Sequence, residues 1–277
     1  MQEIMRSFLK YAGSKAKSVN FLKTHLLKGK RLVEPFVGSA VIFLNTDYDE
    51  YLLGDSNPDL INVFNWVKSE KKHFIVDLEY YFCPQNNTPE MYNAFRQDFN
   101  MYSQNDYTRA LLFVYLNRHG FNGLCRYNSK GQYNVPFGQN SKPYFPLTEL
   151  KAFIDKSDRA SFVCADFIET LSWVQEGDVI YCDPPFISLD HKESQLLKLP
   201  SASLYMRNFN VDEHYNLIEY GLQSKVPFFI SNHDTPDIRQ IYESYNPIKL
   251  ESYSVRRLVA ADVECRNMVK ELLVQLR

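Results

Sequence analysis

The sequence lacks long apolar runs and ordered cysteine spacings. No run approaches the length needed to cross a bilayer, and we expect neither a membrane span nor a secretion signal. The five cysteines are scattered without a CxxC or CxxxH spacing, so no zinc motif or disulfide framework is predicted, and reduced thiols suit a cytoplasmic protein. The 277 residues, 45% of them hydrophobic, are enough to bury a full core in one large domain with an insertion, or in two domains.

Acidic residues are missing from two long segments of the chain. None lies between Ile4 and Val33, where eight residues are basic, and none lies between Tyr107 and Thr148, where an even spread of the 33 acids would place about five. The net charge of −2 gives no general attraction to a polyanion, but the two basic tracts can attract one locally. Aromatic side chains interleave the second tract, an arrangement that suits stacking on bases and following phosphates. The alternatives are an organellar transit peptide and a solvated loop.

The first core elements predict a doubly wound α/β sheet. A β-rich run, Arg31–Phe36, ends in a glycine turn that opens an apolar helix, and a second strand closes with Asp55. In such sheets this acid accepts hydrogen bonds from a ribose hydroxyl pair, and Asp55 follows Gly38 by nearly twenty residues, as expected. Asp166-Phe167, after a later strand, offers an acceptor and a ring edge to an adenine. A P-loop NTPase is not predicted, because no GxxxxGK spacing occurs.

The rest of the chain alternates between helical and strand patterns. A helical block begins with start signals at Pro58, Thr88-Pro89 and Asp106 and forms an insertion between strands. The expected later elements are a helix over 148–155, strands over 161–164, 178–182 and 227–231, an irregular loop over 206–209, a helix from residue 211, a polar loop over 232–235, and terminal strands over 248–253 and 268–276.

Two tight turns separate short aromatic runs within residues 117–138. Asn-Gly and Lys-Gly pairs of this kind predict a protruding β-hairpin. Arg126 has the chemistry to bond a guanine in a major groove, and Leu124 and Pro136 can meet a thymine methyl group. The alternative is an ordinary surface hairpin.

The segment Asp183-Pro184-Pro185-Phe186 follows a predicted strand and combines residues typical of a binding or catalytic site: a carboxylate, two rigid prolines and an aromatic ring. Its prolines can continue neither a helix nor a central ladder. Because they fix φ and remove two donors, the Asp183 carboxylate and the Pro184 carbonyl can point together at one amino group. Phe186 can then lie flat against the ring that carries this group. The alternative is a strand followed by a surface turn.

These motifs together resemble the Dam-type DNA adenine N6-methyltransferases of the D12 class. The matching motifs include Glu34–Gly38, Asn122–Asn128, Asn134–Gly138, Asp183–Pro185 and Ser231–Thr235. The resemblance covers nearly the whole chain and implies a Rossmann-like doubly wound mixed sheet with an inserted helical target-recognition domain that carries a β-hairpin. Residues 1–56 and 146–277 then form the catalytic domain, and residues 57–145 form the DNA-binding target-recognition domain.

The resemblance also implies ligands and site residues. It implies S-adenosylmethionine as the methyl donor and double-stranded DNA with a GATC target as the substrate. We expect a cytoplasmic monomer of bacterial or phage origin without membrane contact. The catalytic positions implied are Asp183, Pro184 and Phe186, and no metal is implied. The donor-binding positions are Tyr11, Ala12, Gly13, Lys15, Phe36, Gly38, Asp55, Asp166, Phe167 and Asp183. The DNA-binding positions are Lys10, Arg118, Asn122, Leu124, Arg126, Asn134 and Pro136, among which Lys10 and Arg126 match residues that read guanines.

The chemistry of such an enzyme requires the base to leave the stack. The adenine amino nitrogen is a poor nucleophile because its lone pair is delocalised into the ring, and inside a duplex it cannot reach a sulfonium methyl group. Asp183 and the Pro184 carbonyl would accept its two hydrogens and stabilise the developing charge, while Phe186 holds the ring. Cytosine C5 methylation needs an activated thiol instead, and the chain has no Pro-Cys pair.

Two other functions fit parts of the same pattern. One is a methyltransferase for RNA, for a protein glutamine or for another DNA target, and the other is a DNA-binding protein without turnover. Four positions also depart from the family: Phe186 replaces a tyrosine, Ala40 a second glycine, Tyr11 a tryptophan, and the neutral segment 139–141 replaces basic residues. The last change predicts weaker DNA binding with a shallower salt dependence.

Overall fold

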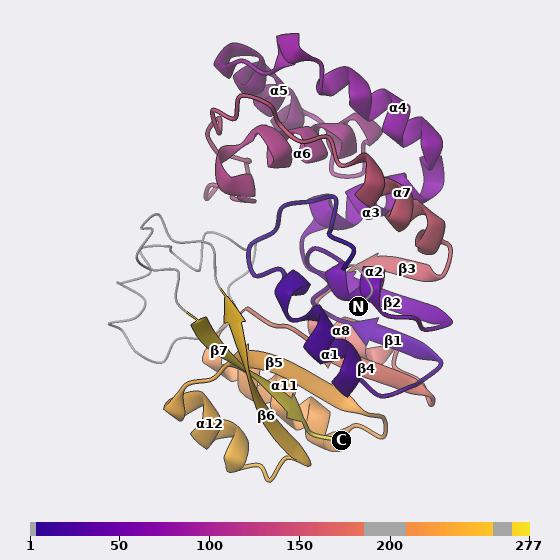
Figure 1. Ribbon diagram of the computed structural model, residues 1–277, viewed down its shortest axis with the longest axis vertical. Helices are drawn as coiled ribbons and strands as arrows, with labels where there is room; N and C mark the ends of the chain where they lie inside the picture. The colour runs from indigo at the N-terminus through magenta and orange to yellow at the C-terminus, as the bar shows by residue number, and fades with distance from the viewer. Residues whose placement is uncertain (1–3, 186–208, 257–267) are drawn as a thin grey trace.

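A seven-stranded sheet forms the centre of the computed structural model, which describes residues 4–185, 209–256 and 268–277 (Figure 1). Its strands are β1 (Arg31–Glu34), β2 (Glu50–Asp55), β3 (Ala160–Cys164), β4 (Asp178–Cys182), β5 (Phe228–His233), β6 (Lys249–Arg256) and β7 (Met268–Gln275). They lie in the order β3-β2-β1-β4-β5-β7-β6; neighbours from β3 to β5 are parallel, and β7 is antiparallel to β5 and β6. The sheet confirms the predicted mixed α/β fold.

Helices cover both faces of the sheet, because side chains from its parallel strands are buried on both sides. Leu32 packs into one apolar cluster and Val33 into the other, and Tyr181 and Cys182 on β4 alternate in the same way. The first face is covered by α1 (Val19–His25), α2 (Val41–Asn45), α3 (Pro58–Glu70) and α7 (Leu147–Ser157). The second is covered by α8 (Phe167–Ser172), α11 (Val211–Gln223) and α12 (Pro236–Glu243). This is the predicted doubly wound arrangement.

The other helices of the described ranges lie between β2 and β3. They are α4 (Lys72–Tyr81), α5 (Pro89–Met101) and α6 (Tyr107–His119), with the 3-10 turns η2 (Pro84–Asn86) and η3 (Phe121–Gly123); a further turn, η1 (Lys15–Lys17), precedes α1. Asn57, Thr88 and Asp106 cap α3, α5 and α6 by accepting hydrogen bonds from first-turn amides, which confirms the predicted starts. No helix in the described ranges is both long and apolar enough to span a bilayer.

Helix α6 forms the centre of the inserted region. Its residues from Arg109 to His119 are all buried, and α3, α4 and α5 pack around it. Figure 1 shows α4, α5 and α6 together at one end of the molecule, with α12 at the other. Because α3 also packs on β2, β3 and α7, and one apolar cluster runs from the sheet into the insertion, the domain limits at residues 57 and 145 stay a prediction.

The predicted hairpin within residues 117–138 is present as a doubled-back loop. Two isolated antiparallel bridges join Tyr127 to Tyr133 and Gly120 to Phe137, and no regular strand forms between them. The segment therefore returns on itself as predicted, but side-chain contacts rather than a strand ladder hold it together.

One predicted loop differs from the structure, and a second lies mostly outside the described residues. The polar loop over 232–235 is wrong for its first two residues, since β5 continues through Asn232 and His233. The antiparallel strand β7 pairs with them and extends the sheet, opposite Leu272 and Glu271. The irregular loop over 206–209 lies outside the described residues except for its last position.

The turn after β1 places two residues in the left-handed region. Gly38 has a φ of 47° and Ala40 a φ of 58°, and Ala40 is fully buried at the start of α2. Glycine adopts this conformation freely, whereas the Cβ of another residue crowds the backbone at a cost of about 1–2 kcal/mol. Ala40 is therefore a strained position.

We expect Ala40→Gly to stabilise the protein. Relief of the left-handed strain outweighs the extra entropy of glycine in the unfolded chain, so the free energy of unfolding should rise by about 0.5–1 kcal/mol. The control is Ala94→Gly on the exposed side of α5, where the same change should cost about 1 kcal/mol. Urea denaturation measures both variants, and equal destabilisation of the two would contradict the strain.

Candidate functional site

A pocket opens at the carboxyl ends of β1 and β4. These strands are neighbours, but the chain leaves β1 for β2 on one side and reaches β4 only after β3, so the strand order reverses between them. Ligands of doubly wound sheets bind at such a switch point. The pocket encloses about 1000 Å³ including its open mouth, and its walls are the loop 11–15, the turn 34–39 and the residues that follow β2, β3 and β4.

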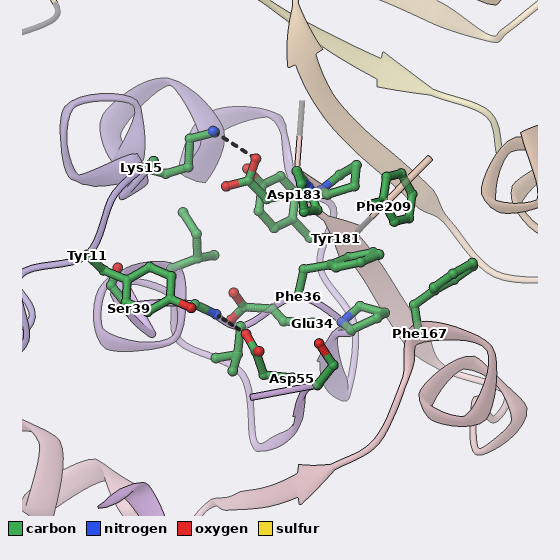
Figure 2. Close-up of a pocket in the computed structure, with 18 of the residues that line it drawn as sticks. Tyr11, Lys15, Glu34, Phe36, Ser39, Asp55, Phe167, Tyr181, Asp183 and Phe209 are labelled. Atoms are coloured by element: carbon green, nitrogen blue, oxygen red, sulfur yellow. Dashed lines mark hydrogen bonds and ion pairs between the residues drawn. The ribbon is translucent and has the colours of Figure 1, made fainter. Parts of the chain in front are cut away.

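Asp55 closes β2 and lines the pocket beside the turn after β1. The Gly38 amide donates to Asp55 Oδ2 at 3.0 Å, and the Asn57 amide donates to Asp55 Oδ1 at 2.9 Å (Figure 2). Burial raises the pKa of Asp55 to about 6, and these backbone donors oppose the shift. The carboxyl group is thus held in a defined orientation at its predicted place.

Three phenylalanines gather on another side of the pocket (Figure 2). Phe36 and Phe167 lie nearly parallel, at 23° with ring centroids 5.6 Å apart, and Phe209 meets Phe36 edge-on at 5.5 Å. Asp166 also lines the pocket and caps α8 by accepting a hydrogen bond from the Glu169 amide at 2.9 Å. The structure therefore brings the predicted residues Phe36, Asp166 and Phe167 together with Gly38 and Asp55.

Asp183 follows β4 directly and forms the charged side of the pocket with Lys15 (Figure 2). Lys15 Nζ lies 2.7 Å from Asp183 Oδ1 and 3.9 Å from Glu271 Oε2, and the Lys15 side chain is only 4% exposed. Burial raises the pKa of Asp183 to about 6, while the charge of Lys15 acts to lower it. Lys15 therefore contacts the carboxylate that the sequence predicts to be catalytic.

The residues around Asp183 complete this side. Pro184 and Pro185 line the pocket, whereas Phe186 lies outside the described residues. The Tyr253 hydroxyl donates to Glu271 Oε2 at 2.8 Å, so the second carboxylate near Lys15 is itself held in place.

The loop 11–15 packs against the turn after β1. Ser14 Oγ and Ser39 Oγ lie 3.0 Å apart, and a Cβ added at Gly38 would lie 3.4 Å from the Tyr11 ring. The predicted donor-binding residues of this loop that line the pocket are Tyr11, Ala12, Gly13 and Lys15.

Glu34 lines the pocket but was not among the predicted site residues, although it begins the matching motif Glu34–Gly38. It ends β1 with 2% of its surface exposed, and in the described part of the chain its Oε1 has no hydrogen-bond partner. Burial raises the pKa of Glu34 to about 8. The charge of Asp183 adds to this rise, whereas the charge of Lys156 lowers the pKa. An acid at the end of a buried strand was the available signal, because such residues are rarely buried without a partner or a function.

Asn117, at the end of α6, brings Lys10 to the doubled-back loop. It accepts a hydrogen bond from the Lys10 amide at 2.7 Å and donates to the carbonyls of Lys10 at 2.7 Å and Gly123 at 3.1 Å. Gly123 leaves so little room that an added Cβ would lie 2.3 Å from Lys10 Cβ. The predicted DNA-binding residues Lys10, Asn122 and Leu124 are therefore neighbours, and Asn122 is exposed.

Arg126 and Asn134 face each other across the same loop. Arg126 Nε donates to Asn134 Oδ1 at 2.8 Å, and Arg126 Nη2 donates to the Asn134 carbonyl at 3.0 Å. Pro136 is exposed, and its carbonyl accepts from the Phe121 amide at 2.9 Å. Six of the seven predicted DNA-binding residues thus lie in or beside one surface loop.

Arg118 is the exception, because the structure buries it below the surface. It is 6% exposed, and its guanidinium donates to the Phe8 carbonyl at 2.8 Å and to the Ser7 carbonyl at 3.3 Å. The group also lies 5.5 Å from the centre of the Tyr144 ring. The main-chain carbonyls occupy this guanidinium, so Arg118 anchors the N-terminal segment, and its DNA contact stays a prediction.

We expect Lys15→Met to raise the pKa of Asp183 above 6. Methionine fills similar space but lacks the positive charge that favours the carboxylate. Carboxyl ¹³C NMR of aspartate-labelled protein measures the titration, with Lys17→Met on the exposed side of η1 as the control. An Asp183 titration that is the same in Lys15→Met and wild type would contradict the pairing.

Known proteins match this chain over most of its length. Residues 11–255 match the family described as D12 class N6 adenine-specific DNA methyltransferase. A DNA adenine methylase of Vibrio cholerae is 42% identical over 272 residues, which cover 97% of this chain and 95% of the relative. The DNA adenine methylase of Escherichia coli K12 is 40% identical over 97% of this chain and 94% of the relative, and that of Serratia marcescens is 41% identical over 98% of each. Because these matches span the pocket, the inserted helices and the doubled-back loop, the chain belongs to the D12 class of N6 adenine-specific DNA methyltransferases.

Proposed function

We propose that the chain transfers a methyl group from S-adenosylmethionine to the N6 amino group of an adenine that has left duplex DNA, within a GATC target. The observation that carries this proposal is the pocket at the switch point, which holds Asp55 and Asp183 in one continuous space. Family membership provides the reaction class. The pocket adds one acid suited to a ribose and another suited to an amino group.

The pocket residues fit a donor made of a purine, a ribose and an amino acid. Asp55 is suited to accept from ribose hydroxyls, and Asp166 with the Phe167 ring is suited to the adenine. Among the described residues Glu34 Oε1 has no hydrogen-bond partner, so it offers an acceptor for an ammonium group. When bound, the donor supplies an electrophilic methyl carbon on a positively charged sulfur. The chain has only to bind and orient it.

Asp183 and the Pro184 carbonyl are proposed to activate the target amine. As acceptors of its two hydrogens, they localise the nitrogen lone pair and stabilise the positive charge that develops on the nitrogen. Lys15, 2.7 Å from Asp183, holds the carboxylate in place for this role. With a pKa of about 6, Asp183 can also take the proton that the methylated nitrogen must lose. Phe186 is proposed to stack on the target ring.

The doubled-back loop is proposed to read the DNA. Arg126 carries the donor pattern for guanine O6 and N7, and Leu124 and Pro136 offer apolar contact to a thymine methyl group. Lys10 lies beside this loop through its contacts with Asn117 and reaches the same duplex. The target adenine has to leave the helix, because the duplex hides its amino group from the pocket.

Transfer of a labelled methyl group from S-adenosylmethionine tests the proposal. We expect the wild type to methylate a GATC duplex in preference to a duplex without the site, to tRNA and to protein. Asp183→Asn keeps the size of the side chain and removes its negative charge, so the rate should fall about 10²-fold or more. In plasmid DNA from cells that express the chain, a restriction enzyme blocked by adenine methylation in GATC should no longer cut. Transfer to RNA alone, or full activity in Asp183→Asn, would contradict the proposal.

We expect binding of S-adenosylhomocysteine to release a proton near pH 7. This non-reactive probe carries the same ammonium group as the donor, and a nearby positive charge lowers the raised pKa of Glu34, about 8 in the free protein. Affinity should therefore rise with pH up to about 8, because below that value the Glu34 carboxyl must first lose its proton. Asp183 and Lys156 act on the same carboxyl, and burial lowers the pKa of Lys156 to about 8.

Calorimetric titration in buffers of different protonation enthalpy counts the released protons. Glu34→Gln should abolish the release, whereas Glu79→Gln, exposed on α4, should leave it intact. A release that persists in Glu34→Gln would assign the proton to another group, such as Lys156, and would contradict this role of Glu34.

A further inference from the structure

A buried charge pair links α3 to α6. Asp59, in the first turn of α3, accepts hydrogen bonds from Arg109 Nε at 2.5 Å and Nη2 at 3.0 Å, and the two side chains are 1% and 7% exposed. Arg109 Nη1 donates to the carbonyls of Phe99 at 2.6 Å and Tyr102 at 3.0 Å. Because a buried charge is costly unless it is paired and hydrogen-bonded, this network has one well-defined arrangement.

Tyr127 joins the pair from the doubled-back loop. Its hydroxyl donates to Asp59 Oδ2 at 2.6 Å, the oxygen that also accepts from Arg109. Burial raises the pKa of Tyr127 well above its ordinary value, and the charge of Asp59 adds to the shift, so the hydroxyl remains a donor. A short bond from a hydroxyl to a buried carboxylate is a strong one. It fixes Tyr127 relative to the start of α3.

The start of α3 is also where the proposed donor-binding acid is held. The Asn57 amide donates to Asp55 Oδ1 at 2.9 Å, and the Asn57 side chain accepts from the Asp59 amide at 3.1 Å. Asp55 and Asp59 therefore belong to one hydrogen-bonded turn. One of these acids lines the pocket, and the other holds the loop.

The loop is braced internally as well. The Tyr133 hydroxyl donates to the Leu124 carbonyl at 2.8 Å, and an isolated antiparallel bridge joins Tyr133 to Tyr127 on the opposite side of the loop. Arg126, the residue before Tyr127, is held by Asn134. A braced loop moves as a unit, so the bond from Tyr127 to Asp59 sets the position of Arg126 relative to the pocket.

We propose that Tyr127 is a positioning residue for target specificity, which acts by fixing Arg126 at the distance from the pocket that the correct base sequence requires. This inference rests on the proposed function. Bidentate reading of a base pair depends on precise placement of the guanidinium, whereas general attraction to phosphates does not. Loss of the Tyr127 hydroxyl should therefore impair the choice of target and spare the binding of the donor.

Tyr127→Phe tests the inference, because it removes the hydroxyl and keeps the ring. The ratio of kcat/KM for a GATC duplex to kcat/KM for duplexes with one altered base pair should fall about tenfold. The Kd of S-adenosylhomocysteine should stay at the wild-type value. Tyr107→Phe is the matched control, since the Tyr107 hydroxyl also donates to a carboxylate, Asp77 Oδ2, at 2.6 Å in the same helical insertion, and its ratio should not change.

Three outcomes decide the matter. A ratio unchanged in Tyr127→Phe would overturn the inference and leave the proposed function standing, and so would an equal fall in Tyr107→Phe. A wild type that methylates no duplex would overturn the proposed function itself. Lost stability lowers both kcat/KM values by the same folded fraction and leaves their ratio unchanged, so a fall in the ratio reports lost discrimination.

Discussion

The ion pair between Lys15 and Asp183 is the contact on which the site depends. Burial alone raises the pKa of a carboxyl group at the end of β4, and the nearby ammonium group favours its charged form. Glu271 on β7 lies 3.9 Å from Lys15 Nζ and is held by Tyr253 from β6. An N-terminal loop, a central strand and the C-terminal pair of strands thus meet around one carboxylate. The antiparallel edge of the sheet therefore contributes to the site as well as to the core.

The same N-terminal segment is tied to the inserted helices. The Asn117 side chain accepts a hydrogen bond from the Lys10 amide and donates one to the Lys10 carbonyl. The Arg118 guanidinium donates to the carbonyls of Ser7 and Phe8. The segment then continues into the loop 11–15 at the pocket. One short stretch of chain thus connects the end of α6 with Asp183, and the turn from Asp55 to Asp59 makes a second connection on the other side of the pocket. Each connection uses hydrogen bonds that are buried or partly buried, so the pocket and the loop are held in a defined relation.

The parts of the structure that depend on local sequence were predictable. The strand before Asp183 has the predicted limits, and α3, α5 and α6 start at the predicted caps, because capping and proline geometry act over a few residues. Asp55, Asp166 and Phe167 also lie at the strand ends where the sequence places them, whereas Phe209 was not predicted to line the pocket. Family resemblance added the loop 11–15, which no local pattern assigns to the pocket.

Contacts between distant segments account for what was missed. The burial of Arg118 depends on the position of the main-chain carbonyls of residues 7 and 8 in the folded chain. A stretch of sequence without acidic residues indicates a positive charge, but it does not indicate which of its basic side chains are exposed. The extension of β5 through His233 depends on pairing with β7. The hydrogen bond from Tyr127 to Asp59 joins a loop to a helix start across the length of the insertion, and no spacing rule predicts it.

A crystal structure of the chain with S-adenosylhomocysteine and a GATC duplex is the most direct measurement of the central claim. The account predicts ribose hydroxyls within hydrogen-bonding distance of Asp55 and an extrahelical adenine whose amino group contacts Asp183 and the Pro184 carbonyl. An adenine that remains stacked in the duplex, or a cofactor bound away from the pocket between β1 and β4, would contradict it.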